Sequence, residues 1–288
     1  MSTAASTSTS NTAHASTDVD PAVRARAAQR PGEVIMRTQG LEMSFGQTHA
    51  LRGVDLDLSA GEVLAVTGPS GSGKSTLLHV MAGVLVPDAG SVSYHGGGAA
   101  GGIKASASGA TTVDIAALDE AARSRLRLSE FGFIFQFGQL LPDLTALDNV
   151  TIPLLLAGSP RRKALTQARE ALEELGLSEH MDKRPGQLSG GQAQRAAVAR
   201  ALVTNPRILF ADEPTGSLDS LAAERTMEVL LNSVHSRGAA LVIITHDARV
   251  AAYADREVTV RDGRVGPGAT RAGSGPSVPR HAATGSRS

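Results

Sequence analysis

Short apolar runs alternate with longer amphipathic stretches over the last third of the chain. The apolar runs have the length of β-strands, and the stretches between them repeat their apolar residues with the period of a helix. We therefore predict strands at 208–212, 240–245 and 257–261, and helices at 192–203, 220–235 and 247–254. Strands that alternate with helices in this way indicate a parallel sheet covered by helices on both faces.

The first part of the chain carries shorter strand-like runs before a long helical stretch. We predict strands at 34–37, 41–44, 54–58, 62–67, 91–94 and 131–135, and helices at 74–82, 116–128 and 163–175. The segment 95–112 is rich in Gly, Ala and Ser, which is typical of a surface insertion. The mostly helical stretch from about 137 to 201 is expected to form a subdomain attached to the sheet.

Both ends of the chain differ from this pattern in composition. Residues 1–30 are dominated by Ser, Thr and Ala without hydrophobic periodicity, and residues 266–288 by Gly, Ser, Pro, Ala and scattered Arg. Such segments bury too little apolar area to offset the entropy cost of ordering them. We therefore predict two disordered tails around one folded domain at 34–265.

The overall composition argues against several classes of protein. The 288 residues include 28 basic and 28 acidic side chains, so nothing in the net charge points to nucleic acid as a partner. The absence of Cys excludes disulfides and thiolate metal sites. No apolar stretch approaches the roughly 18 to 20 residues needed to cross a bilayer, and the N-terminus lacks the features of a secretory signal. If the protein serves a membrane, we expect another polypeptide to span it.

The strongest chemical signal is a glycine-rich loop between a predicted strand and a predicted helix. Its sequence fits G-x-x-x-x-G-K-[ST] and reads Gly68-Pro69-Ser70-Gly71-Ser72-Gly73-Lys74-Ser75. The glycines allow consecutive backbone N–H groups to point at phosphate, and the helix that follows directs its positive end at the same anion. Lys74 would neutralise phosphate charge, Ser75 would bind Mg²⁺ and Thr76 would be a further nucleotide contact. Alone, the loop indicates an NTPase or a kinase.

Two adjacent carboxylates, Asp212 and Glu213, follow the apolar run that begins at Ile208. The carboxyl ends of parallel strands meet at the edge of the sheet where ligands bind, so both acids are expected beside the phosphates. Asp212 would hold Mg²⁺, directly or through water. Glu213 would polarise the attacking water, a general-base role worth roughly two to four orders of magnitude in rate.

A second anion cradle identifies the class of NTPase. Ser189, Gly190 and Gly191 open a predicted helix with free N–H groups and a hydroxyl, and Gln192 follows them. One nucleotide already has the first cradle, so we expect the second to face a nucleotide on another molecule. With Leu188, this segment resembles the LSGGQ signature of the ATP-binding subunits of ABC transporters.

The resemblance covers about residues 34–265 and implies a fold, a cofactor and a partner. The implied fold is an α/β P-loop NTPase with a RecA-like core sheet, an antiparallel β subdomain and an inserted helical subdomain that carries the signature. The cofactors implied are ATP and Mg²⁺. Two copies of the chain would form a head-to-tail dimer in which the signature of each copy closes over the ATP of the other.

The resemblance also assigns roles to residues outside these three motifs. Gln136 looks like the glutamine that contacts the metal ion or the attacking water and reports to the membrane partner. His246 looks like the histidine that contacts the γ-phosphate, and Asp219 like the aspartate that communicates between the two sites. Phe45 occupies the position of the aromatic that stacks on adenine, although a Phe between short strands is equally consistent with a core residue. Ser217 replaces an Asn frequent in related sequences, with little expected consequence.

Three segments resemble one branch of this family, the MacB, LolD and FtsE group: residues 132–136, 140–150 and 211–216. ATPases of this branch pair with separately encoded FtsX-like permeases, and we expect the segment after Gln136, with its apolar run at 140–147, to dock the permease. The branch implies a peripheral subunit at the cytoplasmic face of the membrane that powers export or extraction of a lipoprotein or lipophilic substrate. The alternative within the branch is an FtsE-like transmitter of mechanical signals at cell division. The insertion at 95–112 and the two tails are not typical of the group.

Two further classes of protein, soluble ABC ATPases and non-enzymatic regulators, are disfavoured. Translation-associated ABC ATPases carry two cassettes in one chain, and chromosome-maintenance members interrupt the cassette with coiled coils, for which no heptads are present here. A non-enzymatic, ATP-gated brace would usually lose Glu213 or His246, and both are present.

Overall fold

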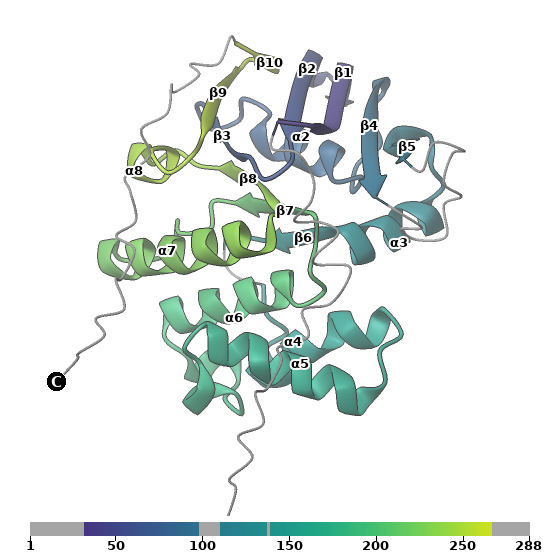
Figure 1. The fold of residues 1–288 in the computed structure, drawn as a ribbon. Coiled ribbons are helices and arrows are strands. Elements are labelled where there is room, and N and C mark those ends of the chain that lie inside the picture. Colours follow the sequence, from purple (N-terminus) through teal and green to yellow (C-terminus); the bar gives the residue numbers. More distant parts are fainter. Residues whose placement is uncertain (1–31, 98–109, 137–138, 267–288) are drawn as a thin grey trace, which may run out of the picture.

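The computed structural model describes residues 32–97, 110–136 and 139–266 and arranges them as two β-sheets and a group of helices (Figure 1). The predicted tails lie outside the described residues, apart from Gly266. Most of the predicted insertion, at 98–109, also lies outside them.

The larger sheet is the predicted parallel sheet. Its strands have the order β10-β9-β3-β8-β7-β6, and every neighbouring pair is parallel except β9 with β10. The strands are β3 (Val63–Thr67), β6 (Phe131–Ile134), β7 (Ile208–Asp212), β8 (Ala240–Ile244), β9 (Arg256–Arg261) and β10 (Arg264–Val265). The short β10 was not predicted. The carboxyl ends of β3, β6, β7 and β8 therefore meet at one edge.

The central strands are apolar throughout because both faces of the sheet are covered. Successive side chains point to opposite faces, so Leu64 and Val66 of β3 belong to one core cluster while Val63 and Ala65 belong to another. The first cluster joins the sheet to α2 (Lys74–Met81) and the smaller sheet. The second joins it to helices that include α6 (Gly190–Leu202), α7 (Ser220–Arg237) and α8 (Ala248–Ala251).

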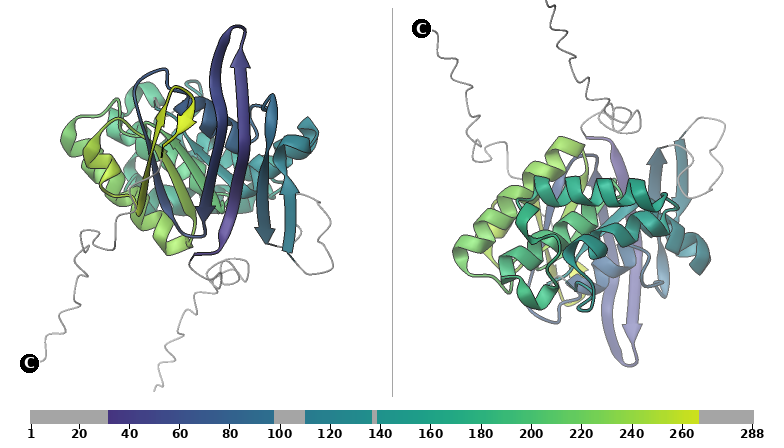
Figure 2. Two further views of the ribbon diagram at one scale, coloured as in Figure 1. Left: turned by 90° about the horizontal axis from the view of Figure 1, so that it is seen from above. Right: turned by 90° about the horizontal axis from the view of Figure 1, so that it is seen from below.

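The smaller sheet is antiparallel and has the order β2-β1-β4-β5. Its strands are β1 (Val34–Phe45), β2 (Thr48–Ser59), β4 (Ala89–Gly97) and β5 (Ala110–Asp114). Seen from above in Figure 2, these strands lie across the molecule in front of the larger sheet. The antiparallel sheet that the family resemblance implied is thus confirmed.

Three local predictions were wrong. The ends of the predicted insertion, at 95–97 and 110–112, pair with each other as parts of β4 and β5. Residues 34–37 and 41–44 belong to the single strand β1, in which the pairing with β2 shifts register between Thr38 and Leu41. The irregularity contains Gly40, with φ 58° and an N–H that donates to Asp55 Oδ1 at 2.6 Å. A β-bulge therefore explains the apparent break in the sequence pattern.

The predicted helix at 116–128 is also divided. A single turn at Ile115–Ala117 is followed by α3 (Glu120–Glu130). The side chains of Asp114 and Asp119 accept hydrogen bonds from the backbone N–H groups of Ala116 and Ala122, at 3.1 and 2.7 Å. Each Asp thus begins its own helical turn, since a capping carboxylate satisfies N–H groups that a helix start leaves free.

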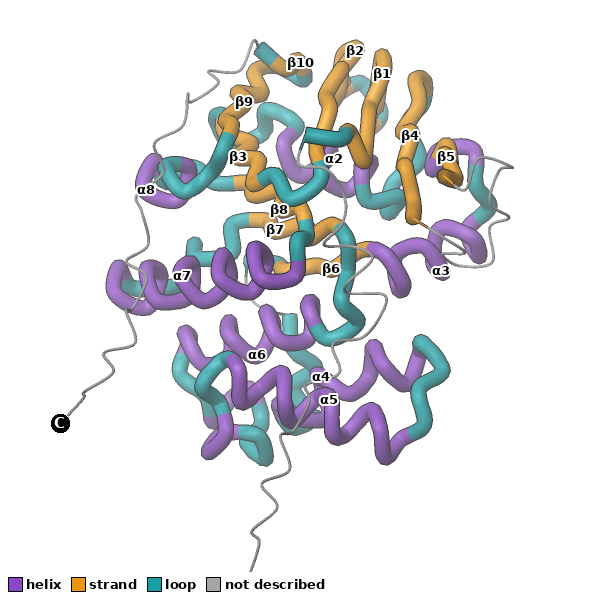
Figure 3. The backbone as a smooth tube through the Cα atoms, viewed as in Figure 1, coloured by secondary structure: helices purple, strands orange, loops and turns teal. Residues whose placement is uncertain are grey.

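The segment between β6 and β7 is mostly helical. It contains α4 (Ala146–Leu156), α5 (Arg161–Glu174) and α6, with single turns at Ser178–His180 and Pro185–Gln187. Figure 3 shows these helices gathered at the end of the molecule opposite the antiparallel strands. Among the described residues, none of the helices combines the length and apolarity that crossing a bilayer requires.

Candidate nucleotide-binding site

The glycine-rich loop connects β3 to α2, as its sequence predicted. Gly68 has φ 140°, and a Cβ added there would lie 2.1 Å from the carbonyl oxygen of Val260 on β9. Gly73, the N-cap of α2, has φ 103°, and its added Cβ would lie 2.3 Å from the carbonyl oxygen of Ala50 on β2. Both positions therefore require glycine, because the backbone of a neighbouring strand occupies the space of a side chain.

The loop is suited to hold an anion. Lys74 is buried with 8% of its surface exposed, and its Nζ donates to the carbonyl oxygens of Gly68 and Pro69 at 2.9 and 2.7 Å. An ammonium has three donors, and these two bonds use only two. The Ser72 hydroxyl is buried without a hydrogen-bond partner among the described residues, and α2 begins without a side-chain cap. These donors fit a phosphate group, which supplies several acceptor oxygens.

The close approach at Gly68 leads to a stability prediction. We expect Gly68→Ala to lower the free energy of unfolding by about 3 kcal/mol or more, because the methyl group would overlap the Val260 carbonyl and the backbone would be strained. Gly61→Ala is the matched control, since Gly61 has φ 71° with open space around it and should cost only about 1 to 2 kcal/mol. Denaturant unfolding measures both. Equal losses would show that the contact with β9 contributes nothing.

Three proposed catalytic residues come together at the carboxyl ends of adjacent strands. Gln136 follows β6, Glu213 follows β7 and His246 follows β8. Gln136 Nε2 donates to Glu213 Oε2 at 3.3 Å, and His246 Nδ1 lies 3.0 Å from Glu213 Oε1. The Glu213 side chain is 22% exposed and that of His246 is 69% exposed. The carboxylate is therefore held from both sides while remaining accessible to water.

The backbone at Glu213 is unusual for a residue with a side chain. Its φ is 47°, in the left-handed region, and its N–H donates to the Ile244 carbonyl oxygen at 3.0 Å. Such a conformation costs of order 1 kcal/mol or more and is found preferentially at functional sites. The turn redirects the chain directly after β7, which brings the carboxylate toward Gln136 and His246.

Asp212 lies at the same level of the sheet as the start of the glycine-rich loop. It is paired with Ile244 of β8, and Ile244 is paired on its other side with Val66 of β3, two residues before Gly68. Ser75 and Thr76 lie in the first turn of α2, at the end of that loop. The carboxylate of Asp212 and the Ser75 hydroxyl are oxygen ligands of the kind that Mg²⁺ prefers.

Sequence reasoning missed two contacts of Gln136. A Cβ added at Gly216 would lie 3.1 Å from Gln136 Nε2 and 3.2 Å from Glu213 Oε2, so a larger residue would press on this pair. The Ser217 hydroxyl donates to the Gln136 carbonyl oxygen at 3.3 Å. Ser217 was expected to matter little, but its side chain contacts the glutamine segment. The order of residues gave no signal for a contact across 81 positions.

The signature segment begins α6. Ser189 is the N-cap, its Oγ accepts from Gln192 N at 3.3 Å, and Gln192 Oε1 accepts from Ser189 N at 2.8 Å. Added Cβ atoms at Gly190 and Gly191 would lie 3.4 Å from Leu218 and 3.3 Å from Ala222, at the start of α7. No hydrogen bond among the described residues joins this segment to the glycine-rich loop of the same chain.

Asp219 and Phe45 occupy different surroundings. Asp219 is the N-cap of α7, and its Oδ1 accepts from Ala222 N at 2.8 Å, which places it beside the signature glycines. Phe45 ends β1 and is 51% exposed. It is therefore not a core residue, and it begins the turn into β2, the strand whose Ala50 carbonyl lies against Gly73.

The fold and the loop define a P-loop NTPase. Residues 51–216 match the family model described as ABC transporter. The protein belongs to this family, as the signature segment predicted, and it is an ABC-type ATPase that forms the ATP-binding subunit of a transporter.

Relatives and solved structures agree with this assignment. Lipoprotein-releasing system ATP-binding protein LolD 2 of Caulobacter vibrioides is 44% identical over 236 residues, which is 80% of this chain and 96% of that protein. LolD of Geobacter metallireducens is 42% identical over 81% of this chain and 96% of its own length. The dimeric post-hydrolysis cassette MJ0796 bound to ADP and Pi superposes with a TM-score of 0.71 at 32% identity, covering 83% of this chain and all of its own. The cassette cbiO1 of Clostridium perfringens gives 0.70 at 28% identity, over 83% of this chain and 89% of its own.

Proposed function

We propose that this ATPase powers a separate FtsX-like membrane permease that extracts or exports a lipoprotein or another lipophilic substrate. The observation that carries the catalytic part is the Glu213 carboxylate held by Gln136 and His246 beside the glycine-rich loop. The relatives named as lipoprotein-releasing proteins support the substrate class. They also favour extraction over the alternative of an FtsE-like mechanical transmitter.

The residues at the sheet edge would have different roles in ATP hydrolysis. Lys74 and the N–H groups of the loop would bind the phosphates, and Glu213 would accept the proton of the attacking water. His246 and Gln136 would orient the Glu213 carboxylate and contact the γ-phosphate and the water. Ser75, Asp212 and Gln136 would hold Mg²⁺, which neutralises phosphate charge when it is bound. Phe45, which is exposed, would stack on adenine.

Each site would be completed by a second copy of the chain. Ser189 is the N-cap of α6 and Gly190 and Gly191 begin it, no hydrogen bond among the described residues joins them to the phosphate loop of the same chain, and the solved cassette MJ0796 is dimeric. In the proposed dimer the segment from Ser189 to Gln192 binds the γ-phosphate held by the other copy, and Asp219 lies between the two sites. Hydrolysis would open the dimer, because loss of the bridging γ-phosphate removes the contact that favours closure.

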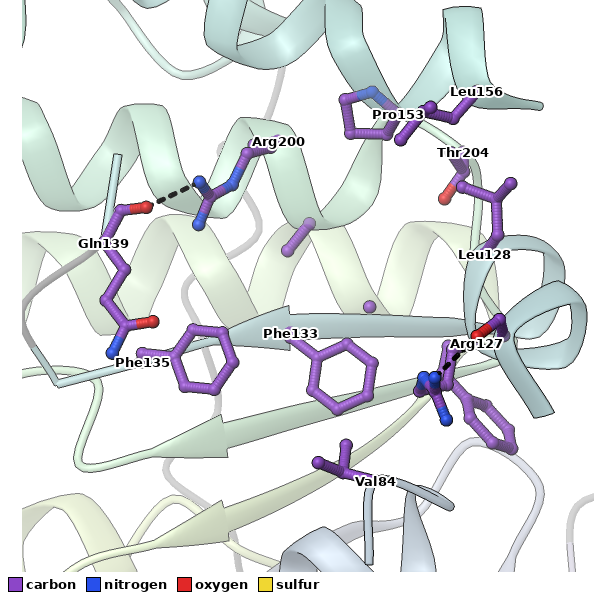
Figure 4. Close-up of a pocket in the computed structure, with 14 residues that line it drawn as sticks. Val84, Arg127, Leu128, Phe133, Phe135, Gln139, Pro153, Leu156, Arg200 and Thr204 are labelled. Atoms are coloured by element: carbon purple, nitrogen blue, oxygen red, sulfur yellow. Dashed lines mark hydrogen bonds between the residues drawn. The ribbon is translucent and has the colours of Figure 1, made fainter. Parts of the chain in front are cut away.

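The permease would dock in a groove of about 660 Å³ between the larger sheet and the helical group. Figure 4 shows the aromatic rings of Phe133 and Phe135 on one side and Pro153 and Leu156 of α4 on the other. The rings of Phe133 and Phe135 stack with centroids 6.1 Å apart. Such an apolar groove suits an amphipathic helix of a partner protein.

Two guanidinium groups also lie in the groove, and that of Arg127 is ion-paired with Glu120 at 2.6 Å. Arg127 of α3 and Arg200 of α6 line the groove, and Arg200 Nη1 donates to the Gln139 carbonyl oxygen at 2.8 Å (Figure 4). Burial lowers the pKa of Arg200, because the charged guanidinium is less well solvated there. The occupant we propose is an amphipathic coupling helix of the permease, with its apolar face against Phe133 and Phe135.

This location changes the expected docking surface. The apolar run at 140–147 was expected to receive the permease, but Ala146 and Leu147 are 0% and 7% exposed because they form the first turn of α4 in the helical core. Leu141 remains 48% exposed. In the groove, Leu156 is 69% exposed.

Leu156 and its neighbour provide a test with a matched control. We expect Leu156→Glu to abolish co-purification of an integral membrane permease with the tagged chain from detergent-solubilised membranes, because a carboxylate in the apolar groove would have to be desolvated. Leu155→Glu makes the same change one residue earlier, at a position 39% exposed that does not line the groove, and should leave co-purification intact.

The identity of the captured protein separates the candidate functions. An FtsX-like permease with a large domain on the far side of the membrane supports extraction or export. A division protein captured with it would favour the FtsE-like alternative. Equal capture by both leucine variants would refute the groove as the docking site, and the absence of any permease would refute the proposed function itself.

A further inference from the structure

A histidine outside every recognised motif contacts the signature segment. His180 ends the single helical turn at Ser178–His180, and its Nε2 lies 2.7 Å from Gln192 Nε2. The contact is partly buried, and His180 Nδ1 is fully buried with no hydrogen-bond partner among the described residues. The ring is therefore enclosed on one side while its other nitrogen contacts the signature glutamine.

The hydrogen bonds of Gln192 determine which nitrogen of His180 carries the proton. Gln192 Oε1 accepts from Ser189 N at 2.8 Å, so the carboxamide oxygen must face the N-cap. Its NH₂ group then faces His180 and can only donate. His180 Nε2 must accept that bond, which assigns the proton of the neutral ring to Nδ1. If the Gln192 carboxamide were flipped, its NH₂ group would face the Ser189 N–H, and two donors would oppose each other.

The same histidine lies where the signature meets the helix that lines the groove. The carbonyl oxygens of Met181 and Lys183, just after His180, accept from the N–H groups of Leu147 and Ala146 in the first turn of α4, at 2.9 and 2.8 Å. The later residues Pro153 and Leu156 of α4 line the groove. His180 therefore lies between two contacts: the residues that follow it are bonded to α4, and its own ring contacts Gln192, whose side chain accepts a hydrogen bond from Ser189 N.

We propose that His180 is a positioning residue for the signature. By accepting from Gln192, it holds the carboxamide in the orientation that keeps Ser189 capped and its hydroxyl and the following N–H groups directed at the nucleotide of the second copy. The inference rests on the proposed dimer, because only there does the signature contact nucleotide. His180 itself need not contact nucleotide, water or metal.

A pair of substitutions separates the acceptor from the bulk of the ring. His180→Leu removes the acceptor, whereas His180→Gln can place an amide oxygen close to the position of Nε2. We expect His180→Leu to weaken ATP-induced dimerisation about tenfold in a Glu213→Gln background. This corresponds to about 1.4 kcal/mol for the dimer, or about 0.7 kcal/mol for each of its two His180–Gln192 bonds, which is within the range of a net hydrogen bond. We expect His180→Gln to restore most of that loss.

Dimerisation is measured by light scattering across protein concentrations at saturating Mg-ATP, and ATP affinity is measured in parallel on dilute, monomeric chain. The affinity of the monomer should be the same in all variants, since His180 is bonded to the signature and not to the phosphate loop. A merely structural role would instead lower the thermal midpoint and the monomer affinity together. It would also show no recovery with His180→Gln.

A double variant tests the route through Gln192. If His180 acts by orienting that side chain, His180→Leu should have no further effect on dimerisation once Gln192→Ala is present, whereas independent effects would add. Additive losses, or equal dimerisation by His180→Leu and the parent, would overturn the proposal. Failure of the parent Glu213→Gln chain to dimerise with ATP would refute the dimer and not the bond between His180 and Gln192.

Discussion

The Glu213→Gln variant is expected to bind ATP and to hydrolyse it at least about 100-fold more slowly than the natural chain. A carboxamide cannot accept the proton of the attacking water, and general-base catalysis contributes roughly two to four orders of magnitude. The substitution keeps the size of the side chain and one acceptor for its neighbours, so the phosphate loop should remain intact. ATP would persist between the two copies and the dimer would accumulate.

Steady-state phosphate release and gel filtration with ATP measure the two effects. Glu228→Gln is a suitable control, because Glu228 is an exposed carboxylate on α7, the next helix of the chain. Its turnover should match that of the natural protein. Turnover near normal in Glu213→Gln would disprove the assignment of Glu213 as the base.

Lys74→Ala is expected to weaken ATP binding by about 100-fold. The loss has the size of a charge-assisted hydrogen bond, about 1.5 to 3 kcal/mol. The substitution also leaves the carbonyl oxygens of Gly68 and Pro69 without their donor, so the loop would lose part of its shape before nucleotide arrives. Lys74→Arg should fail as well, since the planar guanidinium is larger than an ammonium and the site is 8% exposed.

Titration with a fluorescent ATP analogue on folded protein, verified by circular dichroism, measures this effect. Lys163→Ala removes an exposed lysine in the first turn of α5 and should leave the affinity unchanged. Unchanged affinity in Lys74→Ala would contradict the role of the loop as the phosphate cradle. Equal losses in both lysine variants would point to general electrostatic attraction instead of a specific bond.

Much of the fold was readable because its elements are local. The strands β7 and β8 are short, continuous apolar runs, and the helix α7 between them repeats its apolar residues with a helical period. The alternation of such elements implies a parallel sheet. The element boundaries that were predicted wrongly depend on single hydrogen bonds to side chains. Asp119 divides the predicted helix at 116–128, and the bulge at Gly40 hides the continuity of β1.

The functional residues also fall into two groups: those that the sequence alone reveals, and those that only the fold brings together. The phosphate loop could be recognised from its sequence because strand, loop and helix are contiguous and the glycines are needed by the backbone itself. The contacts of Gln136 with Glu213 and of Glu213 with His246 span 77 and 33 residues and exist only because β6, β7 and β8 are neighbours in the sheet. The family resemblance suggested these residues, but only the packing of three strands joins them.

The sequence by itself determined that the chain binds nucleotide, and it predicted a second anion cradle that we propose to serve another copy. Both features are short stretches of backbone. Their conformation is set locally, by glycine, by serine and by the start of a helix. The tertiary structure decided the rest: the strain at Glu213, the groove at Leu156 and the bond between His180 and Gln192. Those features depend on distances between segments far apart in the chain, and such distances are set by the packing of both faces of the sheet.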